Sequence, residues 1–194
     1  MIPIAICGKA NTGKNTLSLL LEEEIKARVD SWSGSKFIAF ADPIKEIVKI
    51  MFPSLPKKYL FGSSQYRSKE IPGASTKDGS PLTVRMALTD IGTSAREYNS
   101  DIWIQAFNKR FSKSFKKTVV LVTDVRFRNE FDYLKRLGFY QIRIYRDEII
   151  KGNHISETNQ DSIRDDEFDY VINNNGSLDD LKEQVKKIVD MIVL

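Results

Sequence analysis

Short apolar runs alternate along this chain with segments in which apolar residues recur every three or four positions. A short run bounded by polar residues or glycine is typical of a buried strand, and the longer spacing is typical of one face of a helix. This pattern predicts five strands, at residues 2–7, 37–41, 119–122, 140–146 and 170–172. Because helical segments separate these strands, we expect an α/β fold with three layers, a five-stranded parallel sheet with helices on both faces.

Residues at the ends of the predicted helices indicate where several of them begin and end. Asp42 followed by Pro43 predicts a helix start, with the carboxylate as the cap and the proline in the first turn. Asn129 and Ser177 are expected to cap two later helices, and Gly138 is expected to end the first of these.

Two polar segments interrupt the alternation of strands and helices. Residues 53–81 contain prolines, glycines and many polar side chains, and residues 147–167 are polar and acidic. Neither has a continuous apolar face, so we expect both to be mobile insertions rather than parts of the core.

The composition indicates a folded protein and excludes several kinds of site. Hydrophobic residues make up 41% of the 194 residues, which is enough for a core. Cys7 is the one cysteine and His154 the one histidine, so an internal disulfide and a Cys/His metal cluster are excluded. We expect Cys7 to be a buried strand residue and His154 to pack locally rather than to catalyse.

No feature of the sequence points to export or to a membrane. The apolar runs are all shorter than the ~18 residues that a membrane-spanning helix requires. Residues 1–4 lack the basic leader and apolar stretch of a secretory signal. We therefore expect a cytoplasmic protein with no membrane partner.

Positive charge is concentrated in the middle of the chain. The whole sequence has 30 Lys and Arg against 26 Asp and Glu, but residues 36–117 hold 15 basic and 7 acidic side chains. This excess favours an anionic ligand, either the phosphates of a small molecule or a nucleic-acid backbone. For the basic residues between 109 and 117, an ordinary solvated surface is the alternative.

The most specific motif follows the first predicted strand directly. Residues 8–16 read G-K-A-N-T-G-K-N-T, which matches the pattern G-x-x-x-x-G-K of P-loop proteins between a strand and a helix. The glycines let backbone N–H groups surround a phosphate, and the helix N-terminus adds its positive dipole. Lys14 is placed to reach the β- and γ-phosphates of a nucleotide. Asn15 stands where the strict pattern has Ser or Thr, and Thr16 comes next.

A second charged group follows the strand at residues 119–122. Asp124, Arg126 and Arg128 come at the carboxyl end of a central strand, where open α/β sheets have their ligand crevice. P-loop proteins place a carboxylate near the metal here, so Asp124 is a candidate for the metal side of the site. The alternative is a surface loop with solvated ion pairs.

Two further residues have both a structural and a functional interpretation. Trp103 lies on an apolar helical stripe, so it either packs in the core or contacts a base. Asp42 is either only a helix cap or also part of the active site.

Polar residues near the end of the chain also leave alternatives open. Arg143, Arg146 and Arg164 are all candidates to reach the phosphates of a donor nucleotide, and the sequence does not distinguish them. Residues 173–175 are three asparagines that either contact adenine or simply form a turn.

Taken together, the motifs resemble the phage-type deoxynucleoside monophosphate kinases, which are P-loop kinases. The resemblance runs over nearly the whole chain in the same order, and D-V-R-F-x-N-E is its most specific part. The blocks that carry it are G-K-A-N-T-G-K-N-T, F-A-D-P-I-K-E-I, R-M-A-L-T-D-I-G-T with D-I-W-I, T-D-V-R-F-R-N-E, and H-I-S-E-T with D-Y-V-I-N-N-N-G-S-L-D-D-L.

The resemblance implies a nucleoside-monophosphate-kinase architecture in one domain. Its core would comprise residues 1–41, 118–146 and 168–194, its monophosphate-binding region residues 42–117, and its lid residues 147–167. It further implies transfer of the γ-phosphoryl of ATP, with Mg²⁺, to a deoxynucleoside 5'-monophosphate for DNA synthesis. Small nucleotides would then be the partners, with no nucleic acid, and the protein would be a monomer or a homodimer of bacteriophage type.

The resemblance also implies a role for individual residues. The ATP-binding residues would be Gly8, Lys9, Asn11, Thr12, Gly13, Lys14, Asn15 and Thr16. The acceptor would be bound by Asp42, Arg85, Thr89, Gly92, Thr93, Trp103, Asp124, Arg126 and Glu130. Catalysis would rest on Lys14, Arg85, Asp124 and Arg126, and Mg²⁺ on Asn15, Thr16 and Asp124. The chain departs from the family pattern at Asn15, Thr89 and Arg128, where aspartate, glutamine and proline are usual.

The chemistry of such a transfer agrees with the residues present. An acceptor phosphate is already ionised, so catalysis needs cations that align and neutralise two anions rather than a base. Lys14, Arg85, Arg126 and Arg128 are the candidate cations. Two alternatives stay open on the sequence. One is a P-loop kinase for another phosphorylated acceptor, such as phosphomevalonate or dephospho-coenzyme A, and the other is a module that binds nucleic acid or a regulatory nucleotide.

Overall fold

The computed structural model describes residues 1–30, 32–111, 118–147 and 159–193. Within it the chain forms two compact units. The first unit comprises Met1–Ala39 and Arg110–Leu194, and the second comprises Phe40–Lys109. His154 and the lysines at 113, 116 and 117 lie outside the described residues.

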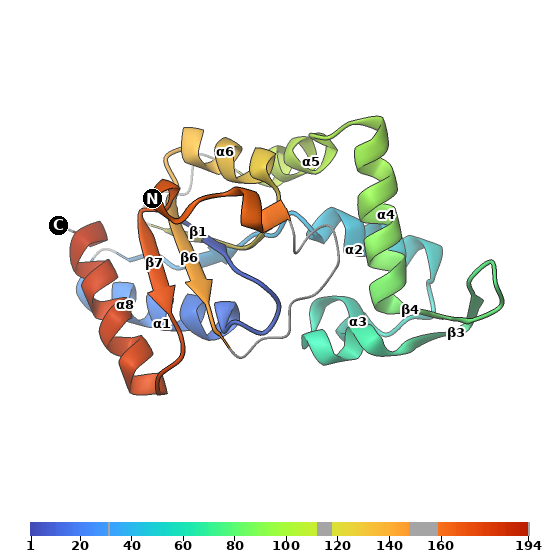
Figure 1. Cartoon of the computed structure of the whole chain (residues 1–194), viewed down its shortest axis with the longest axis horizontal. Coiled ribbons are helices and arrows are strands. Elements are labelled where there is room, and N and C mark those ends of the chain that lie inside the picture. The colour runs from blue at the N-terminus through green and yellow to red at the C-terminus, as the bar shows by residue number, and fades with distance from the viewer. Residues whose placement is uncertain (31, 112–117, 148–158, 194) are drawn as a thin grey trace. The chain divides into compact units, whose positions relative to one another are not determined.

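The first unit is built on a five-stranded sheet in which every pair of neighbouring strands is parallel (Figure 1). The strand order is β2-β5-β1-β6-β7. The strands are β1 (Ile2–Cys7), β2 (Ser35–Phe37), β5 (Val119–Val125), β6 (Tyr140–Tyr145) and β7 (Tyr170–Asn173). The predicted α/β fold with a parallel five-stranded sheet is therefore confirmed.

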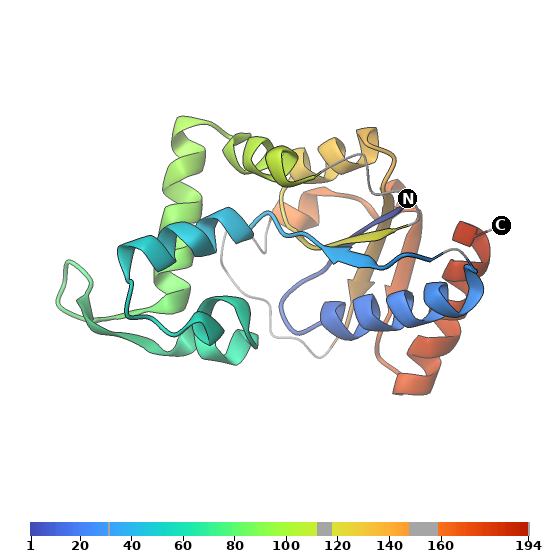
Figure 2. The same cartoon turned by 180° about the vertical axis from the view of Figure 1, so that it is seen from behind.

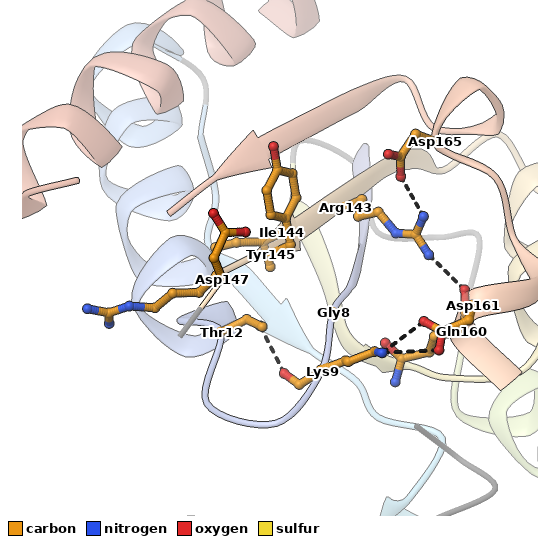
Figure 3. A pocket seen from close by; sticks show the side chains of 11 residues that line it. Gly8, Lys9, Thr12, Arg143, Ile144, Tyr145, Asp147, Gln160, Asp161 and Asp165 are labelled. Carbon is orange, nitrogen blue, oxygen red and sulfur yellow. Dashed lines mark hydrogen bonds and ion pairs between the residues drawn. The ribbon is translucent and has the colours of Figure 1, made fainter. Parts of the chain in front are cut away.

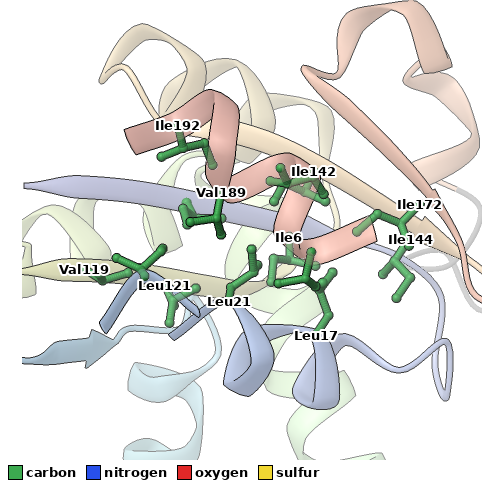
Figure 4. Close-up of a cluster of buried hydrophobic side chains, with 14 of the residues drawn as sticks. Ile6, Leu17, Leu21, Val119, Leu121, Ile142, Ile144, Ile172, Val189 and Ile192 are labelled. Atoms are coloured by element: carbon green, nitrogen blue, oxygen red, sulfur yellow. The ribbon is translucent and has the colours of Figure 1, made fainter. Parts of the chain in front are cut away.

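Helices cover both faces of this sheet. Helices α1 (Lys14–Arg28) and α8 (Leu178–Val193) lie side by side on one face, and α6 (Arg128–Arg136) lies on the other (Figures 1 and 2). Ile4 and Ile6 of β1 pack with Leu17 and Leu21 of α1 in a buried cluster that α8 completes (Figure 4). Since side chains alternate along a strand, Cys7 faces the side of α6.

The second strand differs from its prediction. The apolar run at residues 37–41 predicted a strand, but β2 ends at Phe37, whose side chain is 49% exposed. The Ile38 N–H still donates to the carbonyl of Leu121 at 3.0 Å, and then the chain leaves the sheet. Ile38 and Phe40 are buried outside any strand. A short apolar run therefore indicates burial here but not secondary structure.

Two of the predicted helix ends are confirmed. Gly138 follows the C-terminal end of α6, and its left-handed φ of 81° ends the helix there. Ser177 precedes α8, and its hydroxyl accepts the N–H of Asp180 at 3.2 Å. The Asp180 carboxylate in turn accepts the N–H of Ser177 at 2.8 Å, so the two residues cap each other.

The predicted helix start at Asp42 and Pro43 is confirmed, but neither Asp42 nor Asn129 is the cap residue of its helix. Asp42 is the first residue of α2 (Asp42–Met51), whose cap position is Ala41, and its carboxylate accepts from the Lys45 ammonium at 2.8 Å. Asn129 lies inside the first turn of α6. The capping contact there is made by Glu130, whose carboxylate reaches back to two backbone N–H groups.

The second unit consists mainly of helices and has a core of its own. Its elements after α2 are α3 (Lys57–Phe61), η1 (Ser64–Ser68), the hairpin strands β3 (Glu70–Ser75) and β4 (Pro81–Thr83), α4 (Val84–Tyr98) and α5 (Ile102–Arg110). Leu55, Leu60 and Ile71 are buried here together with Val48 and Val84. The prediction that residues 53–81 lie outside the core is therefore wrong, because three of their apolar residues are part of this core.

The described part of the second polar insertion is also packed. Residues 159–167 form the short helices η2 (Asn159–Ser162) and η3 (Asp165–Glu167) in the first unit. Gln160 is 2% exposed and Ile163 is 1% exposed. The segment thus has two buried side chains although its sequence is polar. Among the described residues, the helices are too short or too polar to cross a membrane.

Candidate active site

The phosphate loop connects β1 to α1 at the carboxyl edge of the sheet. It spans residues 8–13, and α1 begins at Lys14. Gly13 has a left-handed φ of 98°, and Asn11 has a positive φ of 62°. The loop therefore has the strand–loop–helix context that its motif requires.

Both glycines of the motif lie against neighbouring elements. A Cβ atom on Gly8 would stand 2.4 Å from the carbonyl oxygen of Ile144 in β6. A Cβ atom on Gly13 would stand 2.5 Å from the amide nitrogen of Asn174, which directly follows β7. The loop can take this path only because neither residue has a side chain.

Lys14 lies within the curve of this loop. Its ammonium group donates to the carbonyl oxygens of Gly8 and Lys9, each at 2.5 Å. Asn15 and Thr16 follow in the first turn of α1 with exposed side chains. The positive charge of Lys14 thus lies between the loop carbonyls and the N-terminus of α1. A lysine and a helix N-terminus together attract a phosphate.

A pocket of about 410 Å³ adjoins the loop within the first unit (Figure 3). Gly8, Lys9 and Thr12 form one side of it, and the end of β6 together with residues 160–165 forms the other. The Lys9 ammonium is 2.9 Å from the Asp161 carboxylate, so an ion pair joins the loop to η2 (Figure 3). The residues that line the pocket are Gly8, Lys9, Thr12, Arg143, Ile144, Tyr145, Arg146, Asp147, Gln160, Asp161 and Asp165.

The three candidate arginines have different environments. Arg143 of β6 donates to the Asp165 carboxylate at 2.5 Å and to the Gln160 carbonyl at 2.7 Å, and its guanidinium lies 4.7 Å from the Phe168 ring centroid. Arg164 is exposed and pairs with the equally exposed Asp166. Arg146 lines the pocket and is exposed. Arg143 is therefore committed to holding residues 160–168 against the sheet.

The end of β5 contains an irregularity beside the phosphate loop. Ala5 pairs with Val122 and Cys7 pairs with Val125, so β5 has one residue more than β1 between these pairs. The bulge contains Thr123 and Asp124, and both are half-buried. Bulges are frequent next to active sites because they redirect a side chain.

Glu130 supports the segment that follows this bulge. Its side chain is 2% exposed, and one carboxylate oxygen accepts the N–H groups of Arg126 at 2.9 Å and Phe127 at 3.2 Å. The contact determines the path of the backbone at Arg126, which is half-buried. Glu130 was predicted to bind the acceptor, and its described contacts hold the backbone at Arg126.

Arg128 is engaged elsewhere. Its guanidinium forms a paired contact with Glu167, with distances of 2.9 and 2.8 Å, and it also bonds to Asp132 at 3.0 Å. Arg128 stays a predicted cation for phosphate, and in this structure two carboxylates pair with it.

Cys7 is buried, as predicted. Its thiol donates to the side-chain oxygen of Gln160 at 3.6 Å. Burial raises the pKa of the Cys7 thiol to about 11, although the positive charges of Arg143 and Lys14 act in the opposite direction. The thiol is thus protonated at neutral pH, and this argues against a nucleophilic role.

The predicted acceptor residues of α4 lie on one face of that helix in the second unit. Arg85, Thr89, Gly92 and Thr93 are spaced at four, three and one residues, which brings them to the same side. Arg85 is exposed and has no hydrogen bond or ion pair with any residue that the structure describes.

Trp103 belongs to the interior of the second unit. It is 4% exposed, and its indole N–H donates to the carbonyl of Gly92 at 3.0 Å. The same carbonyl accepts from Arg96 at 3.0 Å. Of the two interpretations of Trp103, the geometry favours packing, because the ring and its one polar group are both occupied.

The predicted site residues thus fall into two groups. Gly8–Thr16, Asp124, Arg126 and Glu130 lie in the first unit, and Asp42, Arg85, Thr89, Gly92, Thr93 and Trp103 lie in the second. Sequence reasoning missed Gln160 and Asp161. A polar residue in an acidic segment is expected to be exposed to solvent. The sequence therefore gave no indication that Gln160 or Asp161 lies at the site.

The comparison with known proteins supports a nucleotide kinase. A model of the family described as "Deoxynucleotide monophosphate kinase" matches residues 64–185, a range that begins after the phosphate loop. The chain is also 29% identical over 203 residues to a protein of Acanthamoeba polyphaga mimivirus named "Putative deoxynucleotide monophosphate kinase". That similarity covers 98% of this chain and 97% of the viral protein.

The family match and the strand–loop–helix geometry at residues 8–16 are independent observations, and they point in the same direction. The chain belongs to the deoxynucleotide monophosphate kinase family, and it is a nucleotide kinase.

Proposed function

We propose that the enzyme transfers the γ-phosphoryl group of ATP to a deoxynucleoside 5'-monophosphate and so supplies precursors for DNA synthesis. The observation that carries this proposal is the Lys14 ammonium inside a glycine loop at the N-terminus of α1, in a chain of this family. A loop of this kind suits the β- and γ-phosphates of a nucleotide because the backbone N–H groups and the lysine are both directed at the anion.

The donor is assigned to the first unit. When a nucleotide enters the loop, the Lys14 ammonium exchanges the carbonyls of Gly8 and Lys9 for phosphate oxygens. Lys9 also lines the pocket next to the loop, where its partner is an exposed carboxylate, Asp161. An exposed ion pair contributes little stability, so Lys9 can turn to a phosphate at a small cost.

Magnesium would be held by oxygen donors around the same loop. Mg²⁺ usually binds through one or two carboxylates together with substrate phosphates and water, so a cluster of acidic residues is unnecessary. Among the described residues there is no such cluster, and Thr16, Asn15 and Asp124 supply hydroxyl, amide and carboxylate oxygens that suit the ion. The ion would neutralise charge on the phosphates during transfer.

The acceptor is assigned to the second unit. The shared face of α4 carries the cation of Arg85, which is not neutralised by any described carboxylate, and the hydroxyl groups of Thr89 and Thr93. An arginine grips phosphate oxygens in a defined orientation, and hydroxyl groups can select among sugars or bases. The Asp42 carboxylate, which accepts from Lys45 at 2.8 Å, would orient the acceptor rather than act as a base.

The chemical step then requires cations and alignment. Because the acceptor phosphate is ionised at neutral pH, it attacks without the help of a general base. Arg126, placed by Glu130, and Lys14 would stabilise the charge that is distributed over the transferred group. Asp124, within the bulge of β5, would orient the metal side of the same centre.

An ADP-release assay over all deoxynucleoside and ribonucleoside monophosphates tests the proposal. We expect turnover with one or more deoxynucleoside monophosphates, and little with phosphomevalonate or dephospho-coenzyme A. Lys14→Ala serves as the negative control, since loss of one preorganised electrostatic contact lowers kcat by roughly 10²–10³-fold. Lys182→Ala, on the exposed side of α8, is the matched variant that should keep full activity. Turnover that is unaffected by Lys14→Ala would contradict the donor assignment.

A further inference from the structure

The phosphate loop is fastened from one side by a residue far away in the sequence. Asn174 directly follows β7, and its side-chain amide donates to the carbonyl oxygen of Thr12 at 2.9 Å. The backbone of Asn174 is itself held, because its N–H donates to the Tyr145 carbonyl at the end of β6 at 2.9 Å. The residue is half-buried, so the contact is partly sheltered from water.

This hydrogen bond determines how one peptide group of the loop is turned. The C=O of Thr12 and the N–H of Gly13 belong to the same planar trans peptide, so they point in opposite directions. With the carbonyl directed at Asn174, the N–H of Gly13 is directed away from it, toward the other side of the loop. That N–H has no acceptor among the residues that the structure describes.

Gly13 and Asn174 are also matched in shape. The amide nitrogen of Asn174 occupies the space where a Cβ of Gly13 would lie, at 2.5 Å, and Ile144 stands 3.7 Å from the same position. The backbone of Gly13 has a φ of 98°, which residues with a side chain rarely adopt. The absence of a side chain on Gly13 thus lets the Asn174 amide come close enough to bind the carbonyl of Thr12.

We propose that Asn174 is a positioning residue for the donor phosphates, which it serves by turning the Gly13 N–H group toward the bound anion. The proposal rests on the assignment of the donor to residues 8–16, and it goes beyond it by naming a residue outside the motif. It also differs from the idea that the asparagines at 173–175 contact adenine, since the effect of Asn174 would be exerted on phosphate and not on the base.

The neighbouring asparagine provides a matched control. Asn175 is one position further along the same turn, and its side chain exchanges hydrogen bonds with Asp147, at 2.9 Å to the backbone N–H and 2.6 Å to the carboxylate. It has no hydrogen bond to the phosphate loop among the described residues. Replacing it disturbs the same end of the sheet without releasing Thr12.

The test compares the binding of ATP with that of inorganic tripolyphosphate, which has the phosphates without the nucleoside. Affinities are measured by calorimetry on the full chain for the wild type, Asn174→Ala and Asn175→Ala. We expect Asn174→Ala to weaken both ligands by a similar factor, roughly tenfold for the loss of one oriented donor. Asn175→Ala should leave the affinity for tripolyphosphate unchanged, and the KM for the acceptor should stay the same in both variants.

Other outcomes would overturn the proposal. If Asn174→Ala weakens ATP but leaves tripolyphosphate unchanged, Asn174 acts on the nucleoside; if it weakens neither, the contact has no part in binding. If the wild type binds neither ligand, the donor assignment itself fails. Asn174→Asp, which keeps the shape of the side chain but has no donor, covers the case in which the alanine variant does not fold. Its control for added charge is Asn175→Asp.

Discussion

Arg126 and Arg85 are two cations that the structure places in different settings. The backbone of Arg126 is held by the buried Glu130, whereas Arg85 stands exposed on one face of α4. Their roles should differ accordingly. We expect Arg126 to act mainly on the transferred group, where charge develops, and Arg85 to hold the acceptor before the reaction.

Substitution of each arginine by lysine separates these roles. Lysine keeps the charge but loses the planar fork that orients phosphate oxygens. Arg126→Lys should therefore lower kcat with little change in the acceptor KM, and Arg85→Lys should raise the acceptor KM. Steady-state kinetics with each active deoxynucleoside monophosphate measures both constants. If the two variants keep wild-type constants, neither arginine contacts phosphate.

The thiol of Cys7 allows a test at the residue scale that depends on pH. Because burial raises the pKa of this thiol to about 11, the folded protein holds its proton at pH values where an unfolded chain has begun to lose it. We expect slow labelling by iodoacetamide at pH 8 in the native protein and fast labelling in denaturant. From pH 9 upwards the free energy of unfolding should fall, since the unfolded thiol releases its proton and the folded one does not. Rapid native labelling at pH 8 would show that Cys7 is accessible.

At the scale of elements, the segment at residues 159–168 depends on a few contacts with its neighbours. Arg143 contributes two hydrogen bonds and the contact with Phe168, and Arg128 and Lys135 bind Glu167. These contacts add to the burial of Ile163 and Phe168, two apolar side chains of the segment. They also place Gln160 and Asp161 in the wall of the pocket beside the phosphate loop.

Removal of Arg143 should loosen this segment selectively. We expect Arg143→Ala to speed hydrogen exchange in residues 159–168 and to weaken ATP binding, while exchange in the second unit stays the same. Arg143→Lys should have an intermediate effect, since it keeps the charge and loses the fork. Arg164→Ala is the control, because its ion pair with Asp166 is largely exposed and contributes little. Unchanged exchange in Arg143→Ala would mean that other contacts hold the segment.

At the scale of the whole molecule, each of the two units has its own hydrophobic core. The first is centred on the sheet with α1 and α8, and the second includes Leu60 of α3, which is fully buried. If donor and acceptor bind to different units, a defect in one core should affect one substrate more than the other.

Leu60→Ala tests this division. Removing a buried leucine side chain typically costs about 2–5 kcal/mol of unfolding free energy, and here the loss falls on the second unit. We expect a raised acceptor KM and a lower melting temperature, with the affinity for ATP measured by calorimetry close to that of the wild type. Leu19→Ala, at an exposed position of α1, should change none of these quantities. Equal losses of ATP and acceptor binding in Leu60→Ala would argue against separate assignments.

The sequence by itself determined the parallel sheet, most of its strands and the phosphate loop. These features depend on local spacing: an apolar run for a strand, a period of three to four for a helix, and glycines at defined positions before Lys14. Local patterns of this kind can be recognised without knowing which strands and helices pack against each other. The family resemblance singled out Arg85, Thr89, Gly92 and Thr93, and the structure brings them to one face of α4.

Only the tertiary structure decided which polar residues meet. Asn174 and Thr12 are 162 residues apart, and Cys7 and Gln160 are 153 residues apart, so no period or motif connects them. The packing of residues 53–81 and 159–167 was likewise hidden, because a few buried side chains such as Leu60 and Ile163 suffice to anchor a polar segment. Such contacts arise when strands and helices that are distant in the chain come together. A polar group that is buried in this way needs a hydrogen-bond partner among the residues that surround it, because burial without one costs free energy.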